Sequence, residues 1–138
     1  AVLDAGDVMV EDDALESAQC EFGARIAQLL EAGLLPIGLG GGHEIAYASW
    51  QGLAADLARR SHQAPRVGIL NLDAHLDLRV ANRAHSGTPF RDIALDCERR
   101  GWAFRYACFG VAEAANTGAL YAEAARLAGL RPQLTTFG

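Results

Sequence analysis

The stretch RVGILNL (residues 66–72), followed by DAHLD (residues 73–77), decides the fold of this 138-residue chain. Residues 66–72 are apolar on both faces, which is typical of a central strand in a parallel sheet that is covered on both sides. Acidic and imidazole side chains begin directly after this run. Ligands of open α/β sheets gather outside the carboxyl ends of the strands, so residues 73–77 are expected at a functional edge.

Helical and strand patterns alternate on either side of this strand. An apolar stripe from Leu15 to Leu29, at spacings of three and four, predicts a helix that Asp12 and Asp13 cap and Gly33 closes. Thr88 followed by Pro89 predicts the start of another helix. The remaining expected elements are strands over 34–39 and 104–111, helices over 44–60, 89–101 and 120–127, and a final strand in the tail QLTTFG (residues 133–138).

This alternation of strand and helix predicts one α/β domain over residues 1–138, with a parallel sheet and helices on both faces. Composition agrees, because 51% of the residues are hydrophobic and only 21% are charged, which is enough apolar material for a sizeable core. No segment is long and apolar enough to span a membrane, because Pro36 and several glycines interrupt the longest uncharged stretch.

Charge and residue usage exclude several classes of function. The net charge of −5 argues against a nucleic acid or an anionic membrane as partner. All 12 basic residues are arginines, so neither a P-loop nor a Schiff-base lysine can be present. The three cysteines, Cys20, Cys97 and Cys108, lie far apart, which predicts free thiols packed in the core of a cytoplasmic protein.

The glycine run Gly40–Gly42 precedes His43 at a predicted turn from strand to helix. A dinucleotide-binding fingerprint would need a third spaced glycine at position 43, and a zinc-protease HExxH motif would need histidine where Tyr47 stands. Two interpretations of His43 stay open: a metal ligand, or a structural residue at a helix terminus.

Asp73, His75 and Asp77 alternate along the chain, and alternate side chains of an extended segment point to the same side. Buried carboxylates are costly unless they are paired or bind a metal. Mixed carboxylate and imidazole donors without thiolates favour Mn²⁺, with Zn²⁺, Fe²⁺ and Co²⁺ as rivals, and a bridging carboxylate favours a two-metal hydrolytic site. The alternative is a solvated acidic loop.

Three motifs, GGGHE (residues 40–44), NLDAHLDLR (71–79) and SGTPFRDIA (86–94), resemble the ureohydrolases, the family of arginase, agmatinase and formimidoylglutamase. The chain is most similar to the formimidoylglutamase members. The resemblance implies an arginase-like, three-layer αβα fold with a mostly parallel sheet and a site for two Mn²⁺ ions. His43 and Asp77 would then bind the first ion, His75 the second, and Asp73 both. The implied reaction hydrolyses N-formimidoyl-L-glutamate to L-glutamate and formamide.

Two departures from the family pattern shape the prediction. Ser86 stands where arginases and agmatinases have a histidine, which favours the formimidoylglutamase members. The second aspartate pair (DxD) of the family does not occur after Asp77, so the chain is expected to be the amino-terminal part of a longer, truncated family fold with four of six metal ligands.

Arg79, Ser86 and Arg91 are the candidate substrate-binding residues, since guanidinium groups suit a dicarboxylate product. The expected partner is a small-molecule substrate, and the full-length protein is expected to be a homo-oligomer. Two alternatives remain: an agmatinase or other guanidino-hydrolase, and a non-catalytic metal-binding module.

Overall fold

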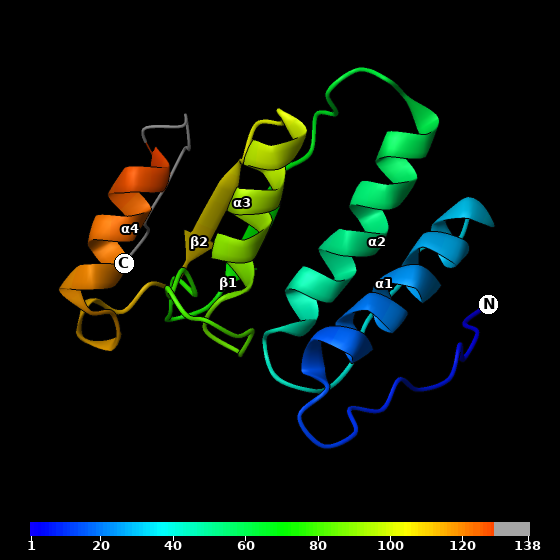
Figure 1. Cartoon of the computed structure of the whole chain (residues 1–138), viewed down its shortest axis with the longest axis horizontal. Coiled ribbons are helices and arrows are strands. Elements are labelled where there is room, and N and C mark those ends of the chain that lie inside the picture. The colour runs from blue at the N-terminus through cyan, green and yellow to red at the C-terminus, as the bar shows by residue number, and fades with distance from the viewer. Residues whose placement is uncertain (129–138) are drawn as a thin grey trace.

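The structure, a computed structural model, describes residues 1–128, in which two consecutive helices are followed by alternating strands and helices (Figure 1). Its elements are α1 (Leu15–Glu31), α2 (Ile45–Arg60), β1 (Ile69–Leu72), α3 (Pro89–Arg100), β2 (Tyr106–Phe109), the 3-10 helix η1 (Glu113–Ala115) and α4 (Gly118–Ala128). The strand expected over residues 133–138 lies outside the described residues.

The ends of the helices follow partly from the predicted signals. Pro89 is the first residue of α3, and Gly101 ends that helix in the left-handed conformation at φ 67°. Thr88 occupies the N-cap position, but its side chain makes no capping hydrogen bond with α3, and its hydroxyl donates to the Asp92 carboxylate at 2.7 Å. At α1 the predicted aspartate cap is wrong, because Ala14 occupies the N-cap position.

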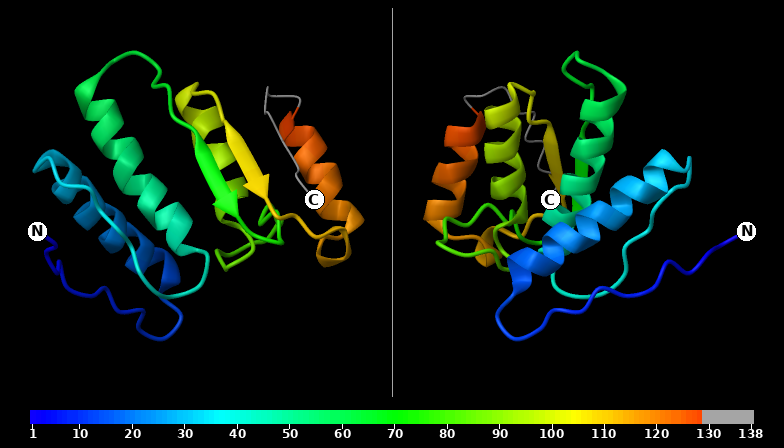
Figure 2. Two further views of the ribbon diagram at one scale, coloured as in Figure 1. Left: turned by 180° about the vertical axis from the view of Figure 1, so that it is seen from behind. Right: turned by 45° about the vertical axis from the view of Figure 1, so that its right-hand side comes forward.

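β1 and β2 form a parallel pair in which Ile69 lies opposite Tyr106 and Leu72 opposite Phe109. The chain passes between them through α3, which covers one face of the pair (Figure 2). The core lies between this face and the helices. Its large members are Trp50, Leu76, Leu78, Phe90, Ile93, Phe104, Tyr106, Leu120 and Leu127.

The structure corrects two expectations about the sheet. The predicted strand over residues 34–39 has no strand assignment, and Leu35, Ile37 and Leu39 are exposed. β1 is buried on one face only, because Leu70 and Leu72 are 76% and 82% exposed. Both errors have one cause: an apolar run becomes a buried strand only where neighbouring strands and helices on both faces cover it. Among the described residues, no strand pairs with residues 34–39, and α3 covers only one face of the β1–β2 pair.

Helices α1 and α2 pack side by side (Figure 1) and meet through two glycines. A Cβ atom added at Gly52 would lie 2.4 Å from the carbonyl oxygen of Gly23 and 2.6 Å from Cβ of Ile26. The two backbones therefore approach more closely than any side chain would permit. This contact sets the position of α2, whose first turn follows His43 directly.

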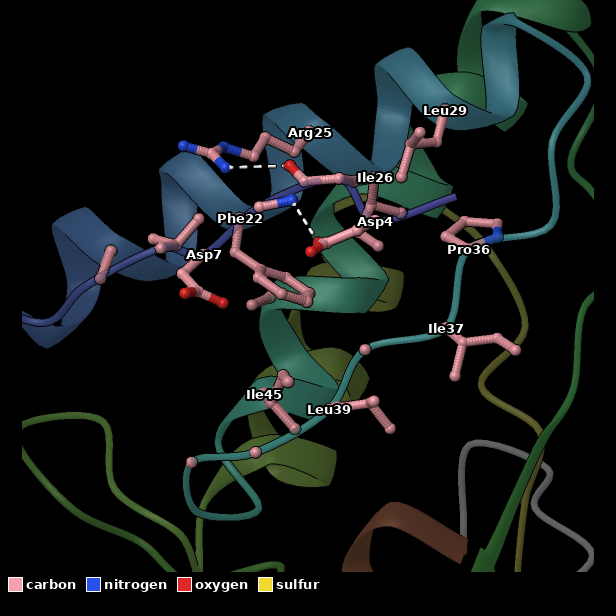
Figure 3. A pocket seen from close by; sticks show the side chains of 18 of the residues that line it. Asp4, Asp7, Phe22, Arg25, Ile26, Leu29, Pro36, Ile37, Leu39 and Ile45 are labelled. Atoms are coloured by element: carbon pink, nitrogen blue, oxygen red, sulfur yellow. Dashed lines mark hydrogen bonds between the residues drawn. The ribbon is translucent and has the colours of Figure 1, made fainter. Parts of the chain in front are cut away.

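A cavity of about 930 Å³ lies between the N-terminal segment, α1 and residues 34–45 (Figure 3). Its lining is mostly apolar, with Phe22, Ile26 and Ile37 among the labelled side chains.

Within the described residues, no helix is both long and apolar enough to cross a membrane. Cys97 and Cys108 are buried free thiols as predicted, whereas Cys20 is exposed, which corrects the expectation for that residue.

Candidate metal centre

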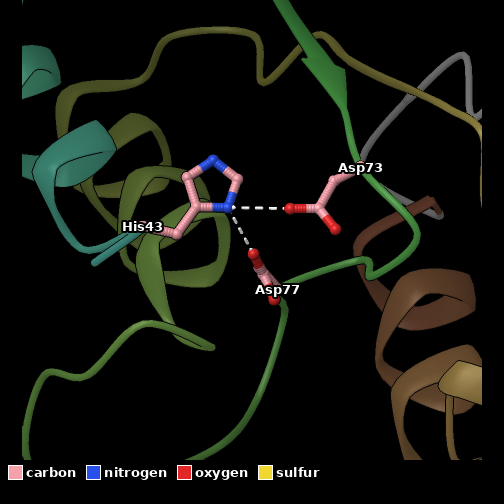
Figure 4. A group of neighbouring side chains, drawn as sticks. All are labelled: His43, Asp73 and Asp77. Carbon is pink, nitrogen blue, oxygen red and sulfur yellow. Dashed lines mark hydrogen bonds and ion pairs between the residues drawn. The ribbon is translucent and has the colours of Figure 1, made fainter. Parts of the chain in front are cut away.

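His43, Asp73 and Asp77 converge although 30 residues separate the first two (Figure 4). Nδ1 of His43 lies 2.6 Å from Oδ2 of Asp77 and 3.2 Å from Oδ2 of Asp73. One donor atom from each of the three residues lies within 4.8 Å of the other two. The sequence prediction that the two motifs meet at one site is confirmed by this geometry.

The glycine run brings His43 into this position. Gly40 and Gly41 adopt φ of 88° and 72°, a left-handed conformation that residues with a Cβ rarely enter, so the chain turns sharply before His43. The ring of Phe90 then contacts the imidazole edge-on, with centroids 5.2 Å apart and planes at 87°. Backbone turn and aromatic contact together fix where the imidazole points.

The expectation that an extended segment places Asp73 and Asp77 on the same side by alternation is wrong. β1 ends at Leu72, and residues 73–75 form bends instead of extended chain. Asp77 itself has a φ of 46°, which is uncommon for a residue other than glycine. This left-handed turn, and not the period of a strand, directs the Asp77 carboxylate to His43.

The surroundings shift the pKa values of the two carboxylates in opposite directions. Burial raises the pKa of Asp77, and the negative charge of Asp73 adds to this rise, while the contact with His43 opposes it only in part. Burial acts in the same direction on Asp73, but hydrogen bonds from the backbone N–H and the ring of His75 outweigh it and lower the pKa of Asp73. The cluster therefore concentrates negative charge that a cation would neutralise.

His75 lies beside this cluster without belonging to it. Its backbone N–H donates to Oδ1 of Asp73 at 2.8 Å, and its Nδ1 lies 3.2 Å from the same oxygen. Nearly half of the His75 side chain is exposed. Asp73 thus faces His43 with one carboxylate oxygen and His75 with the other, which is the arrangement that a bridging ligand needs.

The residues present fit a hard or borderline divalent cation. Two carboxylates and imidazole nitrogens, with no thiolate among them, suit Mn²⁺ better than the soft metals that thiolates select. Among residues 1–128, Asp73 and Asp77 form ion pairs with histidines only, and imidazole is also a common metal ligand. His43, Asp73 and Asp77 could therefore hold one ion, with His75 next to the shared carboxylate.

The structure separates the three candidate substrate-binding residues. Arg79 and Ser86 are both exposed. The segments that carry them are joined by a hydrogen bond from the N–H of Arg79 to the carbonyl oxygen of Gly87 at 2.9 Å. The Arg79 side chain lies across Gly87, where an added Cβ would meet its Cδ at 2.7 Å. Arg91 differs, because its Nε forms an ion pair with Glu123 at 3.1 Å.

Asn116 is a residue of this site whose role sequence reasoning did not identify. Its amide donates to the carbonyl oxygens of Ala74 and Ala112 at 2.8 and 2.9 Å, and its Oδ1 accepts from the N–H of Leu76 at 3.0 Å. Asparagine in a loop signals a turn. The sequence offered no means of showing that this one spans two segments and holds the loop between Asp73 and Asp77.

The family of the chain follows from its sequence over almost its whole length. The family model described as the Arginase family matches residues 1–131. The chain belongs to the arginase family. This membership confirms the resemblance inferred from the three motifs and the expectation of an arginase-like α/β fold.

Curated relatives of this arginase-family chain include formimidoylglutamases. The chain is 60% identical over 127 residues to the formimidoylglutamase of Ralstonia nicotianae and 56% identical over 129 residues to that of Aromatoleum aromaticum. These alignments cover 92% and 90% of the chain but only 39% and 38% of the relatives. The chain therefore spans about two fifths of the length of the curated relatives that it matches.

Solved structures show the same family fold. Trypanosoma cruzi formiminoglutamase, whose crystal structure is described with Mn²⁺, matches with a TM-score of 0.74 and 26% identity over 96% of this chain and 41% of its own. The formimidoylglutamase of Bacillus subtilis matches with a TM-score of 0.74 at 22% identity, and the match covers 97% of this chain and 38% of the Bacillus subtilis chain. At this identity the match supports the fold alone.

Proposed function

We propose that this chain carries part of the metal centre of a manganese-dependent formimidoylglutamase, which hydrolyses N-formimidoyl-L-glutamate to L-glutamate and formamide. The observation that supports it most is the convergence of His43, Asp73 and Asp77 on one point, within 4.8 Å of one another. The names of relatives at 56–60% identity and the Mn²⁺ in the Trypanosoma cruzi structure support the choice of substrate and metal.

The proposed roles of the four residues follow their contacts. His43 and Asp77 would hold a first Mn²⁺, His75 would hold a second ion through its exposed ring, and Asp73 would be shared between the two. When bound, two such ions lower the pKa of water so that hydroxide is present at neutral pH for attack on the amidine carbon. The chain's own part is to hold the ionised Asp73 carboxylate between two imidazoles, which keeps both donor oxygens in place.

Arg79 and Ser86 are the proposed contacts of the substrate. Arg79 is exposed and forms no recorded ion pair with the described residues, so its guanidinium is available for a carboxylate of formimidoylglutamate. Arg91 was predicted for the same task, but its ion pair with Glu123 occupies it, and we propose Arg79 ahead of it. Because the glutamate leaving amine is less basic than an alkylamine, a serine at position 86 is compatible with the reaction.

Metal binding by the chain tests the first part of the proposal. A titration of the 138-residue chain with Mn²⁺, followed by the electron paramagnetic resonance of the free ion, is expected to show no more than one ion bound, weakly. His43→Gln is expected to abolish this binding. The matched control is His62→Gln, which changes an exposed histidine outside the cluster. Equal binding by both variants would refute the site.

Hydrolysis tests the second part. In a protein of the relatives' length that contains this chain, kcat/KM with Mn²⁺ is expected to be highest for formimidoylglutamate among formimidoylglutamate, agmatine and arginine. A preference of ~10-fold for agmatine or arginine, equivalent to ~1.4 kcal/mol, would favour a guanidino-hydrolase. No hydrolysis of any of the three, with metal bound, would favour the non-catalytic metal-binding module.

The location and assembly of the protein also remain proposals. The buried free thiols of Cys97 and Cys108 favour a reducing compartment, and we propose the cytoplasm. Exposed apolar side chains such as Leu70 and Leu72 favour association, and we propose a homo-oligomer for the full-length protein, which light scattering would test.

A further inference from the structure

The backbone at Asp77 needs an explanation that the metal ligands themselves do not supply. A φ of 46° costs free energy for aspartate and persists only where the surroundings impose it. The conformation is essential to the site, because it directs the carboxylate to within 2.6 Å of Nδ1 of His43. The torsions of a residue are set by the two peptide planes that flank it.

Both planes around Asp77 are held by hydrogen bonds. The carbonyl oxygen of Leu76, in the plane before Asp77, accepts from the hydroxyl of Tyr106 at 3.0 Å. The carbonyl oxygen of Asp77, in the plane after it, accepts from the N–H of Phe90 at 3.3 Å. The N–H of Leu76 is held as well, by Oδ1 of Asn116 at 3.0 Å.

Tyr106 connects these contacts. It is almost fully buried in β2, and its hydroxyl also accepts from the side-chain amide of Asn71 at 3.0 Å. Its ring stacks on Phe90 with centroids 4.6 Å apart, and on Phe104 at 5.7 Å. Phe90 in turn contacts the imidazole of His43. A rigid aromatic stack therefore fixes the hydroxyl relative to both Asp77 and His43.

We propose that Tyr106 is a positioning residue of the metal centre: its hydroxyl holds the peptide plane before Asp77 and so keeps the carboxylate directed at His43. Tyr106 is not itself one of the clustered donor residues. The proposal rests on the proposed function for its consequence, since the purpose of the left-handed turn is to complete the ligand set. The turn itself is a property of the metal-free chain.

The test removes one oxygen atom. Tyr106→Phe keeps the ring that stacks on Phe90 and Phe104 and deletes only the hydroxyl. The matched control is Tyr121→Phe, which deletes a hydroxyl in α4 from a ring that packs against the core. Circular dichroism at the working temperature establishes that each variant is folded.

The first readout needs no metal: the backbone ¹³C and ¹⁵N chemical shifts of Asp77 in the metal-free chain report its torsions. We expect Tyr106→Phe to move these shifts toward values for negative φ, and Tyr121→Phe to leave them unchanged. Unchanged Asp77 shifts in Tyr106→Phe, or equal changes in both variants, would overturn the inference.

The second readout is the Mn²⁺ dissociation constant. We expect it to rise ~10-fold or more in Tyr106→Phe, as for other residues that orient metal ligands from behind, and to change by less than ~3-fold in Tyr121→Phe. An Asp77 shift change without weaker Mn²⁺ binding would overturn the positioning role. A wild-type chain that binds no Mn²⁺ would refute the proposed function, while the Asp77 shifts would still decide whether Tyr106 holds the turn.

Discussion

Replacing Gly52 with alanine should destabilise the protein, although alanine is the better helix former. A Cβ atom at this position would lie 2.4 Å from the Gly23 carbonyl oxygen and 2.6 Å from Cβ of Ile26. Non-bonded carbon contacts are most favourable at 3.5–4.0 Å, so α1 and α2 would have to separate by about 1 Å. Backbone and β-carbon atoms cannot move aside as the end of a flexible side chain can.

The expected loss follows from two opposing effects. Inserting a methyl group into a packed contact costs about 1–3 kcal/mol, and the contacts of 2.4 and 2.6 Å at Gly52 place this substitution in the upper part of that range, at about 2–3 kcal/mol. Exchanging glycine for alanine in a helix returns about 1 kcal/mol. The net loss for Gly52→Ala is therefore about 1–2 kcal/mol, which corresponds to a decrease in Tm of roughly 3–10 °C for a chain of this length.

Urea denaturation followed by circular dichroism measures this difference, and two related variants provide the control. At Gly23 an added Cβ would meet Ala48 and Gln51 atoms at 3.0 Å, so Gly23→Ala should cost less. At Gly118, the first residue of α4, nothing lies within 4 Å, so Gly118→Ala should be neutral or stabilising. A Gly52→Ala variant as stable as wild type, or an order other than Gly52, Gly23, Gly118, would refute the reasoning.

Further expected outcomes concern pH, metal and the loop between the two acidic ligands. Burial opposes ionisation of Asp96, but hydrogen bonds from Trp50 and neighbouring arginines outweigh it and lower the pKa of Asp96. The ionised carboxylate therefore stabilises the fold above the unfolded pKa, and this contribution is lost as the pH falls through the lower folded pKa. Urea denaturation between about pH 5 and pH 3 should show a smaller loss of unfolding free energy in Asp96→Asn than in wild type. Mn²⁺ at 100 times its dissociation constant should stabilise the chain by about 2.7 kcal/mol in a thermal melt, and a chelator or His43→Ala should abolish the gain. Asn116→Ala should lower the free energy of unfolding by about 2 kcal/mol, because it leaves the buried N–H of Leu76 and the partly buried carbonyl oxygen of Ala74 unpaired, whereas Asn82→Ala, at an exposed position, should have no measurable effect.

The sequence alone determined the elements whose signals are local. The period of the apolar residues predicted α1, and proline at the start and glycine at the end predicted α3, because such signals act within one turn of the chain. The carboxyl-end rule for parallel strands predicted that the segments carrying His43 and Asp73 would meet, and they do, although the strand that the rule assumed before His43 is not assigned in the structure.

Only the tertiary structure decided what each segment is covered by and which way each ligand turns. Residues 34–39 and β1 have the apolar pattern of buried strands, but burial depends on neighbours that the pattern does not contain, and Leu70 and Leu72 are exposed. The alternation of side chains along an extended segment predicted that Asp77 and Asp73 point to the same side, but this segment is not extended. Its direction comes from a left-handed turn held by Tyr106, 29 positions further along the chain, and no local pattern can encode such a contact.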